Sequence, residues 1–391
     1  MSNKVIVTAD DYGVCDRIDN AILAAIDKKK LTAVSVMVTH DGWEKRLDRL
    51  IEKLKNHKFG IGLHLSITSG VPRANNPYSS LVSPGDEKRQ FMVIKNYNFK
   101  QVLASDLRDE IRAQYKLLHD HLKNGYQNKA EADIPDAFKN IPVDHMTNHH
   151  GVVYFDTDLY RTYVDVAREK KLPIRSPMSW YRKFKGISEL PDYEGTNITN
   201  PTMRRGVKIG MWRRLGQMSY GNFLKRMNSA EHVRVDYPDV LCEYIYGQCK
   251  PEKNKGKEVL DHVLDHFKDY VEGTDKNDGK LIDRSDVSFK AIKIANEKTR
   301  DESLRAAEPP LGYVNSRYDL KVRNREFSME LMFHLGINEN IQDGFTEKDP
   351  PHGINGDYFE KRDGEWQMLR EYDFKTEQAD RKIQLITFQE L

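Results

Sequence analysis

Short apolar runs alternate with segments of helical periodicity through the N-terminal half of the chain. The runs at 4–8, 33–39 and 59–67 predict three strands. Between them, apolar residues return at helical spacing, which predicts two amphipathic helices. The residues that mark these helices are Ile18, Ala21, Ile22, Ala25 and Ile26, followed by Trp43, Leu47, Leu50, Ile51 and Leu54.

The alternation continues after a predicted loop at 71–100, which is rich in Pro, Asn, Ser and Gly. The next expected elements are a helix over 106–122, a strand end within 142–150, a helix over 159–172, and strands within 173–176, 328–336 and 381–391. Strand–helix alternation predicts an α/β fold in which helices cover a parallel sheet. At this length we expect a closed or nearly closed barrel, with its chemistry at the carboxyl ends of the strands.

The segment 181–325 breaks the pattern, because it is rich in Lys, Arg, Asp, Asn and Gly. Helical spacing returns within it at 256–271 and 288–299. The chain shows no internal repeat and no sharp linker. We therefore expect one domain over 1–391, with 181–325 as a large insertion.

Charge and cysteine content narrow the function classes. The 391 residues carry a formal net charge of only +2, which argues against a phosphate-driven grip on nucleic acid. Cys15, Cys242 and Cys249 are few and odd in number, which is typical of a reducing compartment. The N-terminus lacks a signal-like apolar stretch, and no run approaches the roughly 18 apolar residues of a membrane helix. We expect a soluble, cytoplasmic protein.

Ionisable side chains recur at the expected strand ends. Asp10 and Asp11 end the first strand, His64 lies in the third, His149 follows a later strand end and His334 lies near another. A barrel brings such ends to one rim. One carboxylate with two imidazoles is a competent ligand set for a divalent ion such as zinc, manganese or magnesium.

The adjacent carboxylates of Asp10 and Asp11 suggest two roles. In a metal hydrolase, one carboxylate ligates the ion while its neighbour accepts a proton from the attacking water. Adjacent residues of an extended chain point to opposite sides, so a turn must re-aim one of them. Gly13 is suited to that turn.

Each of these residues has an ordinary structural alternative. An Asp-Asp pair after a strand is commonly a turn or a helix cap, and Asp16 is an equally good cap. His64 and His334 taken singly are more typical of hydrogen-bonded core histidines. Their joint occurrence at strand ends favours a site.

Other histidines point elsewhere. His119 and His121 fall on a predicted helix and are typical of surface or packing residues. His262 and His266 form an i,i+4 pair without the glutamate of a zincin helix, so a solvated face is favoured.

Several segments together resemble the YdjC-like carbohydrate deacetylases, a family related to polysaccharide deacetylases. The matching segments are VTADDYG, LTAVSVMVT, IGLHLSITSGVP, DEIRAQYKLL, VDHMTNHHGVV, LPIRSP, MELMFHLG, REYDF and IQLITFQEL. The resemblance covers 1–180 and 326–391 and leaves 181–325 unmatched. It implies a distorted, TIM-like (β/α) barrel that removes an acetyl group from an N-acetylated sugar or oligosaccharide.

The resemblance also implies residue roles. One divalent ion, Mg²⁺ or Zn²⁺, would be held by Asp11, His64 and His149. Asp10 would be the general base, His334 the general acid, and Arg175 would orient Asp10.

Three positions depart from the family pattern. Thr147 occupies the position of the aspartate in the family's His-X-Asp-Ser-His segment. Gly151 occupies the position of a histidine, and Leu335 that of a proline. The first departure removes or replaces a group that supports a metal ligand, which bears on metal affinity or substrate choice.

Other functions stay open at this point. The same ion would serve a hydrolase of phosphoesters or non-sugar amides, and a catalytically silent sugar-binding barrel is a further alternative. We expect a small carbohydrate as the partner, without nucleic acid or membrane, and leave a homodimer open. Candidates to stack on sugar rings are Tyr12, Trp180, Tyr181 and Trp212, although such residues taken singly are more typical of core or rim packing.

Overall fold

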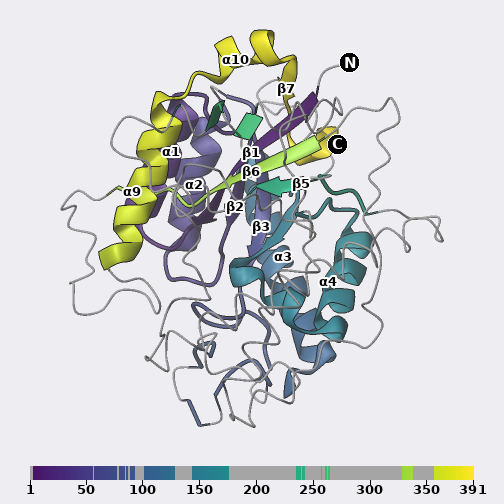
Figure 1. The fold of residues 1–391 in the computed structure, drawn as a ribbon. Coiled ribbons are helices and arrows are strands. Elements are labelled where there is room, and N and C mark those ends of the chain that lie inside the picture. Colours follow the sequence, from purple (N-terminus) through teal and green to yellow (C-terminus); the bar gives the residue numbers. More distant parts are fainter. Residues whose placement is uncertain are drawn as a thin grey trace, which may run out of the picture.

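The computed structural model places one parallel sheet at the centre of the protein, with helices around it (Figure 1). It describes residues 3–92 with short gaps at 56, 77–78, 84 and 87–88, and then 101–127, 143–175, 235–238, 240–242, 328–337 and 356–391. It also describes positions 257, 260, 261, 263 and 264. Trp180, Tyr181, Trp212, Cys249, His262, His266 and the expected helix at 288–299 lie outside these residues.

Seven parallel strands form the sheet among the described residues. They are β1 (Asn3–Tyr12), β2 (Ala33–Val36), β3 (Gly60–Leu65), β4 (Met146–Asn148), β5 (Val240–Cys242), β6 (Ser328–Phe333) and β7 (Ile383–Leu385). Their order is β4-β3-β2-β1-β6-β5, and β7 pairs with the start of β1. The central β1 is a run of β-branched residues, which suits a strand buried on both faces.

The helices form an arc around the outside of the sheet. They are α1 (Asp16–Asp27), α2 (Trp43–Lys53), α3 (Ala104–Gln127), α4 (Thr157–Lys170), α9 (Gly356–Glu371) and α10 (Phe374–Arg381). Contacts link α9 to α1, α1 to α2, α2 to α3 and α3 to α4, so the helical layer curves with the sheet (Figure 1). The result is a curled α/β half-barrel, which confirms the expected fold class.

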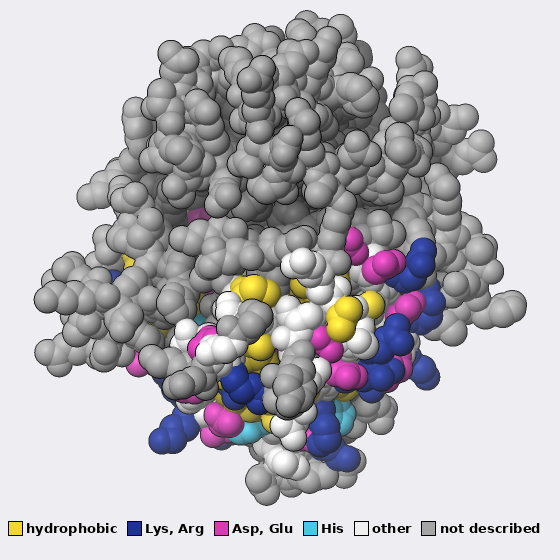
Figure 2. Space-filling model, turned by 90° about the horizontal axis from the view of Figure 1, so that it is seen from below, with side chains coloured by type: hydrophobic (Ala, Val, Ile, Leu, Met, Phe, Trp, Pro, Cys, Tyr) yellow, Lys and Arg dark blue, Asp and Glu magenta, His cyan; other side chains and the backbone are white. Residues whose placement is uncertain are grey.

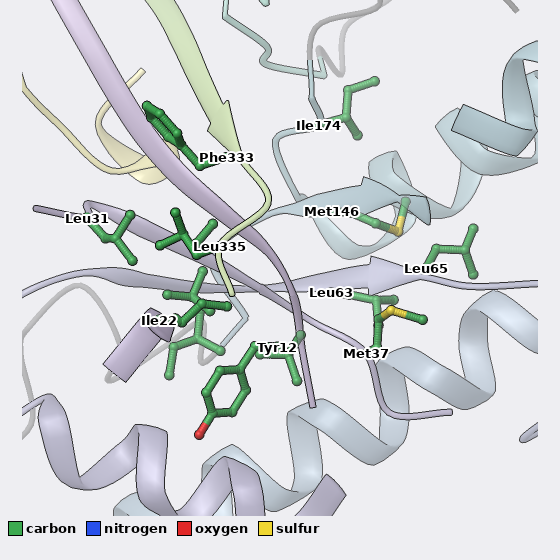
Figure 3. Packing of buried hydrophobic residues seen from close by; sticks show 14 of the residues in the cluster. Tyr12, Ile22, Leu31, Met37, Leu63, Leu65, Met146, Ile174, Phe333 and Leu335 are labelled. Carbon is green, nitrogen blue, oxygen red and sulfur yellow. The ribbon is translucent and has the colours of Figure 1, made fainter. Parts of the chain in front are cut away.

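Two apolar clusters hold this architecture together. The larger lies between the sheet and the helices, and Figure 3 shows part of it around Leu63 and Leu65 of β3. The smaller cluster consists of Ile6, Ala33, Ile386 and Phe388. Phe388 belongs to the short 3-10 helix Phe388–Glu390 at the end of the chain and is fully buried. The C-terminal residues thus pack against the sheet that β1 and β2 build.

Most expected elements are present, with some differences. The expected strand at 173–176 is represented by a single bridge between Ile174 and Met146. β5 and the helices α9 and α10 were not anticipated as elements from periodicity. The insertion at 181–325 lies mostly outside the described residues, so the single-domain organisation stays a prediction. Among the described helices, none is long and apolar enough to cross a membrane.

Charged side chains of both signs are interspersed on the described part of the face in Figure 2. Some of the surface charges of opposite sign form ion pairs, such as Arg112–Glu169 at 2.6 Å. Such pairs contribute little to stability, typically about 0–1 kcal/mol each. The stability of the described part therefore rests mainly on its buried residues.

Replacing Phe388 tests the packing of the C-terminal residues. Phe388→Ala removes a buried ring that stacks on His145 with ring centroids 4.2 Å apart. We expect a loss of about 3–5 kcal/mol in the free energy of unfolding, measured by urea denaturation, because a cavity replaces the ring. Leu103→Ala, at an exposed position, should change it by less than about 0.5 kcal/mol. Equal effects of the two variants would contradict this packing role.

Candidate metal and catalytic site

The ends of β1, β3 and β4 bring one carboxylate and two imidazoles together. Asp11 Oδ1 lies 3.1 Å from His64 Nε2 and 3.0 Å from His149 Nδ1. Ligand atoms of all three residues lie within 4.8 Å of one another, and all three residues are buried. The structure therefore assembles the three residues that the sequence nominated as metal ligands.

The backbone at Asp11 explains how two adjacent carboxylates face one site. Asp11 has φ 68°, in the left-handed region that non-glycine residues rarely adopt. The pairing of β1 with β2 shifts register between Ala9 and Tyr12, which marks an irregularity at this point. The expected re-aiming therefore begins at Asp11 itself, and Gly13, with φ 98°, continues it. Such strain costs on the order of 1–3 kcal/mol and is typical of functional sites.

Thr147 determines which nitrogen of His64 faces the cluster. Its Oγ1 lies 2.7 Å from His64 Nδ1 and 3.4 Å from the carbonyl of Leu63. If the hydroxyl donates to that carbonyl, it accepts from Nδ1–H, and the lone pair of Nε2 then points at Asp11. A hydroxyl acceptor thus lies where the resemblance implied an aspartate.

Arg175 fixes the second carboxylate, Asp10. Its Nη1 and Nη2 lie 2.5 and 2.9 Å from the two oxygens of Asp10, which is a bidentate pair. Arg175 also donates to Glu330 Oε1 from Nε at 2.9 Å and from Nη2 at 2.6 Å. Burial alone would raise the pKa of Asp10, but Arg175, with His64 and His334, lowers it well below its usual value. Asp10 is therefore ionised at neutral pH.

His334 follows β6 and is held by its backbone. Its amide N–H donates to Glu365 Oε2 of α9 in a short contact. Burial lowers the pKa of the His334 imidazole to about 4, although Asp11 and Asp10 oppose this. Burial also raises the pKa of Glu365 to about 8. Both side chains are therefore neutral near pH 7 in this structure.

Arg362 of α9 contacts the other oxygen of the same carboxylate, since its Nη2 pairs with Asp11 Oδ2. Burial would raise the pKa of Asp11, but His149 and Arg362 hold it well below its usual range. The buried ion-paired groups described here are three carboxylates, on Asp10, Asp11 and Glu330, and two guanidinium groups, on Arg175 and Arg362. This local excess of negative charge favours a bound cation.

A second observation also indicates that these ligand atoms suit a divalent cation. His64 Nε2 is buried and makes no hydrogen bond among the described residues, although Asp11 Oδ1 lies 3.1 Å away. A buried nitrogen left in this state is costly unless something else satisfies it. His64, His149 and Asp11 would hold the ion, and two imidazoles with one carboxylate are common ligands of zinc and related metals.

Three residues at the site escaped the sequence analysis: Glu330, Arg362 and Glu365. A lone glutamate inside the apolar run SMELMF was a signal for Glu330, because a charge rarely enters a buried strand unpaired. Arg362 and Glu365 carried no such signal, since charged residues three apart on a helix usually mark a solvated face.

The remaining histidines behave as expected where they are described. His121 Nε2 lies 2.8 Å from the exposed Asp48, and His119 contacts Asp120, so both belong to the surface. His145 takes a different place, because it is buried between Ser35, at 3.1 Å, and Asp144, at 2.8 Å. It supports the sheet and lies apart from the metal-competent cluster.

A curled parallel α/β sheet whose strand ends gather two imidazoles and two carboxylates defines an α/β half-barrel protein with a metal-competent site. Residues 4–124 match the family model described as YdjC-like protein, a span that contains Asp10, Asp11 and His64. This part of the chain is similar to the YdjC-like family, and the relatives that the chain matches are named carbohydrate deacetylases.

Three relatives illustrate the similarity. The chain is 22% identical over 172 residues to a carbohydrate deacetylase of Clostridium beijerinckii, covering 44% of this chain and 59% of that protein. It is 28% identical to carbohydrate deacetylase 2 of Listeria innocua over 45% of this chain and 59% of that protein. It is 30% identical to the carbohydrate deacetylase of Mus musculus over 28% of this chain and 36% of that protein. The chain thus matches less than two thirds of the length of each of these relatives.

A solved structure has a similar fold. It comes from Enterococcus faecalis V583 and is described as a "putative cellobiose-phosphate cleavage protein". The two chains align over 100% of this one and 99% of the other, with a TM-score of 0.52 and 15% identity. At that identity the likeness concerns the fold alone.

The role of Thr147 can be tested by metal binding. Thr147→Val keeps the shape but removes the acceptor for His64 Nδ1, so we expect Zn²⁺ affinity to fall roughly 10- to 100-fold in calorimetric titration. Thr147→Ser and Thr147→Asp both retain an oxygen acceptor and should stay close to wild type. Unchanged affinity in the valine variant would show that the hydroxyl does not orient His64.

The raised pKa of Glu365 predicts that the free energy of unfolding depends on pH. Its pKa rises from 4.5 in the unfolded chain to about 8 in the folded protein. The folded state therefore binds more protons between these values, and stability falls as pH rises from 4.5 to 8, by up to about 1.4 kcal/mol per pH unit.

Glu365→Gln should remove this slope, measured as the free energy of unfolding across that range. Glu371→Gln is the matched control, because Glu371 is exposed on the same helix. A slope that persists in Glu365→Gln would assign it to another group.

Proposed function

We propose that this protein is a metal-dependent hydrolase that removes the acetyl group from an N-acetylated sugar or oligosaccharide. The observation that carries the proposal is the cluster of Asp11, His64 and His149 beside the Arg175-held carboxylate of Asp10. When bound, a divalent ion such as Mg²⁺ or Zn²⁺ would polarise the amide carbonyl and lower the pKa of the attacking water.

Asp10 is the general base in this proposal. Arg175 holds both of its oxygens, so the carboxylate has a fixed position and a low pKa. That pairing keeps Asp10 ionised and ready to accept a proton over a wide pH range. The same pairing limits its basicity, so proton transfer to Asp10 depends on the ion lowering the pKa of the attacking water.

His334 is the general acid that protonates the leaving amine. Its imidazole is neutral in the free site, because burial lowers its pKa to about 4. A proton must therefore reach His334 before the carbon–nitrogen bond breaks. Negative charge that develops on the substrate carbonyl oxygen raises the proton affinity of a nearby imidazole, and the proton accepted by Asp10 is its source in this scheme.

The substrate class follows from the names of the relatives, which are carbohydrate deacetylases. Hydrolysis of a phosphoester or a non-sugar amide would use the same cluster. A silent sugar-binding barrel has no need of an ionised Asp10 held by a buried arginine, so the present site favours catalysis. A reducing, cytoplasmic location is part of the proposal, because the three cysteines of the chain are few and odd in number.

An acetate-release assay tests the function directly. The protein loaded with Zn²⁺ or Mg²⁺ should release acetate from at least one of a panel of N-acetyl sugars and oligosaccharides, and Asp10→Asn should lower the rate by about 10²–10⁴-fold with metal content near wild type. Asp27→Asn, on the exposed side of α1, is the control that should keep full activity. Phosphoester cleavage without acetate release would replace the proposal, and unchanged turnover in Asp10→Asn would exclude Asp10 as the base.

A further inference from the structure

The two oxygens of Asp11 have different partners. Oδ1 faces His64 Nε2 at 3.1 Å and His149 Nδ1 at 3.0 Å, whereas Oδ2 pairs with Arg362 Nη2. A carboxylate with both oxygens free can bind a cation through one or both of them. Here one oxygen is already engaged by a cation that belongs to the protein.

Arg362 is held firmly enough to keep that oxygen. Its side chain is only 2% exposed, and Nη1 donates to the carbonyl of Leu335 at 3.3 Å. A Cβ added at Gly336 would lie 2.9 Å from Arg362 Cβ and 3.3 Å from its Cδ, so a glycine is needed for the arginine to pass. Leu335, the residue that departs from the family's proline, supplies the carbonyl for this contact.

The helix that carries Arg362 is fixed at two further points. Glu365, one turn along α9, accepts from the backbone N–H of His334. Near the start of α9, the ring of Phe359 receives the guanidinium of Arg17 from α1, 4.9 Å from the ring centroid. Arg362 therefore enters the site from a docked helix, which reduces its freedom to leave Asp11.

We propose that Arg362 is a positioning residue that restricts Asp11 to single-oxygen coordination and so tunes the site toward zinc-like ions. The inference rests on the metal site of the proposed function. A one-oxygen carboxylate with two imidazoles suits a low-coordination, nitrogen-preferring ion. Mn²⁺ and Mg²⁺ prefer more oxygen ligands, so they lose more when Oδ2 is withheld.

The test compares two metals of the same charge in the 391-residue chain. Arg362→Met removes a positive charge, which changes the affinity for every divalent ion in the same direction. The ratio of the dissociation constants for Mn²⁺ and Zn²⁺ cancels this effect and reports the freed oxygen. We expect calorimetric titration to show that this ratio falls at least about 10-fold in favour of Mn²⁺.

Further variants separate positioning from a loss of fold. Arg362→Lys keeps a cation able to bond one oxygen, so its ratio should stay near wild type. Gly336→Ala should displace the arginine and shift the ratio in the same direction as Arg362→Met, by a smaller factor. Arg370→Met, on the exposed side of α9, is the control and should leave both constants unchanged.

A second readout is the visible absorption of bound Co²⁺, which is intense for four-coordinate sites and weak for six-coordinate ones. The wild type should give the intense spectrum and Arg362→Met a weaker one. An unchanged metal ratio and spectrum in both Arg362→Met and Gly336→Ala would overturn this inference and leave the proposed function standing. Absence of any metal binding in the wild type would overturn both.

Discussion

The bidentate pair between Arg175 and Asp10 is the interaction on which the site depends. Asp10 lies at the end of the central strand, where water cannot solvate its charge, and burial of an unpaired carboxylate there would cost several kcal/mol. Arg175 compensates this cost and ties β1 to β6 through Glu330. Removal of either partner would leave a buried charge, which is far more costly than the pair is stabilising. The half-barrel and the charged site at its carboxyl end are therefore stabilised by the same contacts.

The inside of the sheet changes character along its length. Towards the start of the strands, Ile6 and Phe388 form an apolar layer, and next to it His145 connects Ser35 and Asp144 while stacking on Phe388. The charged site lies beyond, at the carboxyl ends. An apolar and hydrogen-bonded floor keeps water from the inner side of the site, which strengthens the electrostatic interactions above it.

Strain and charge at Asp11 have a common consequence. The left-handed backbone turns its carboxylate toward the same side as Asp10, which like-charge repulsion opposes. Two guanidinium groups make the arrangement tolerable, one on each carboxylate: Arg175 on Asp10 and Arg362 on Asp11. Because these two guanidinium groups come from distant segments, the two carboxylates have different environments. In our proposal Asp10 accepts a proton and Asp11 binds the metal.

The strand–helix alternation of the N-terminal half, the parallel sheet and the grouping of Asp10, Asp11, His64 and His149 were predictable from the sequence, because hydrophobic periodicity is local and parallel strands share one carboxyl end. The elements β5, α9 and α10 were not predictable in this way. Tertiary structure alone decided that Thr147 orients His64 and that α9 brings Arg362 to Asp11. Those contacts join residues 83 and 351 positions apart in the chain, and no periodicity records which polar side chains meet across such distances.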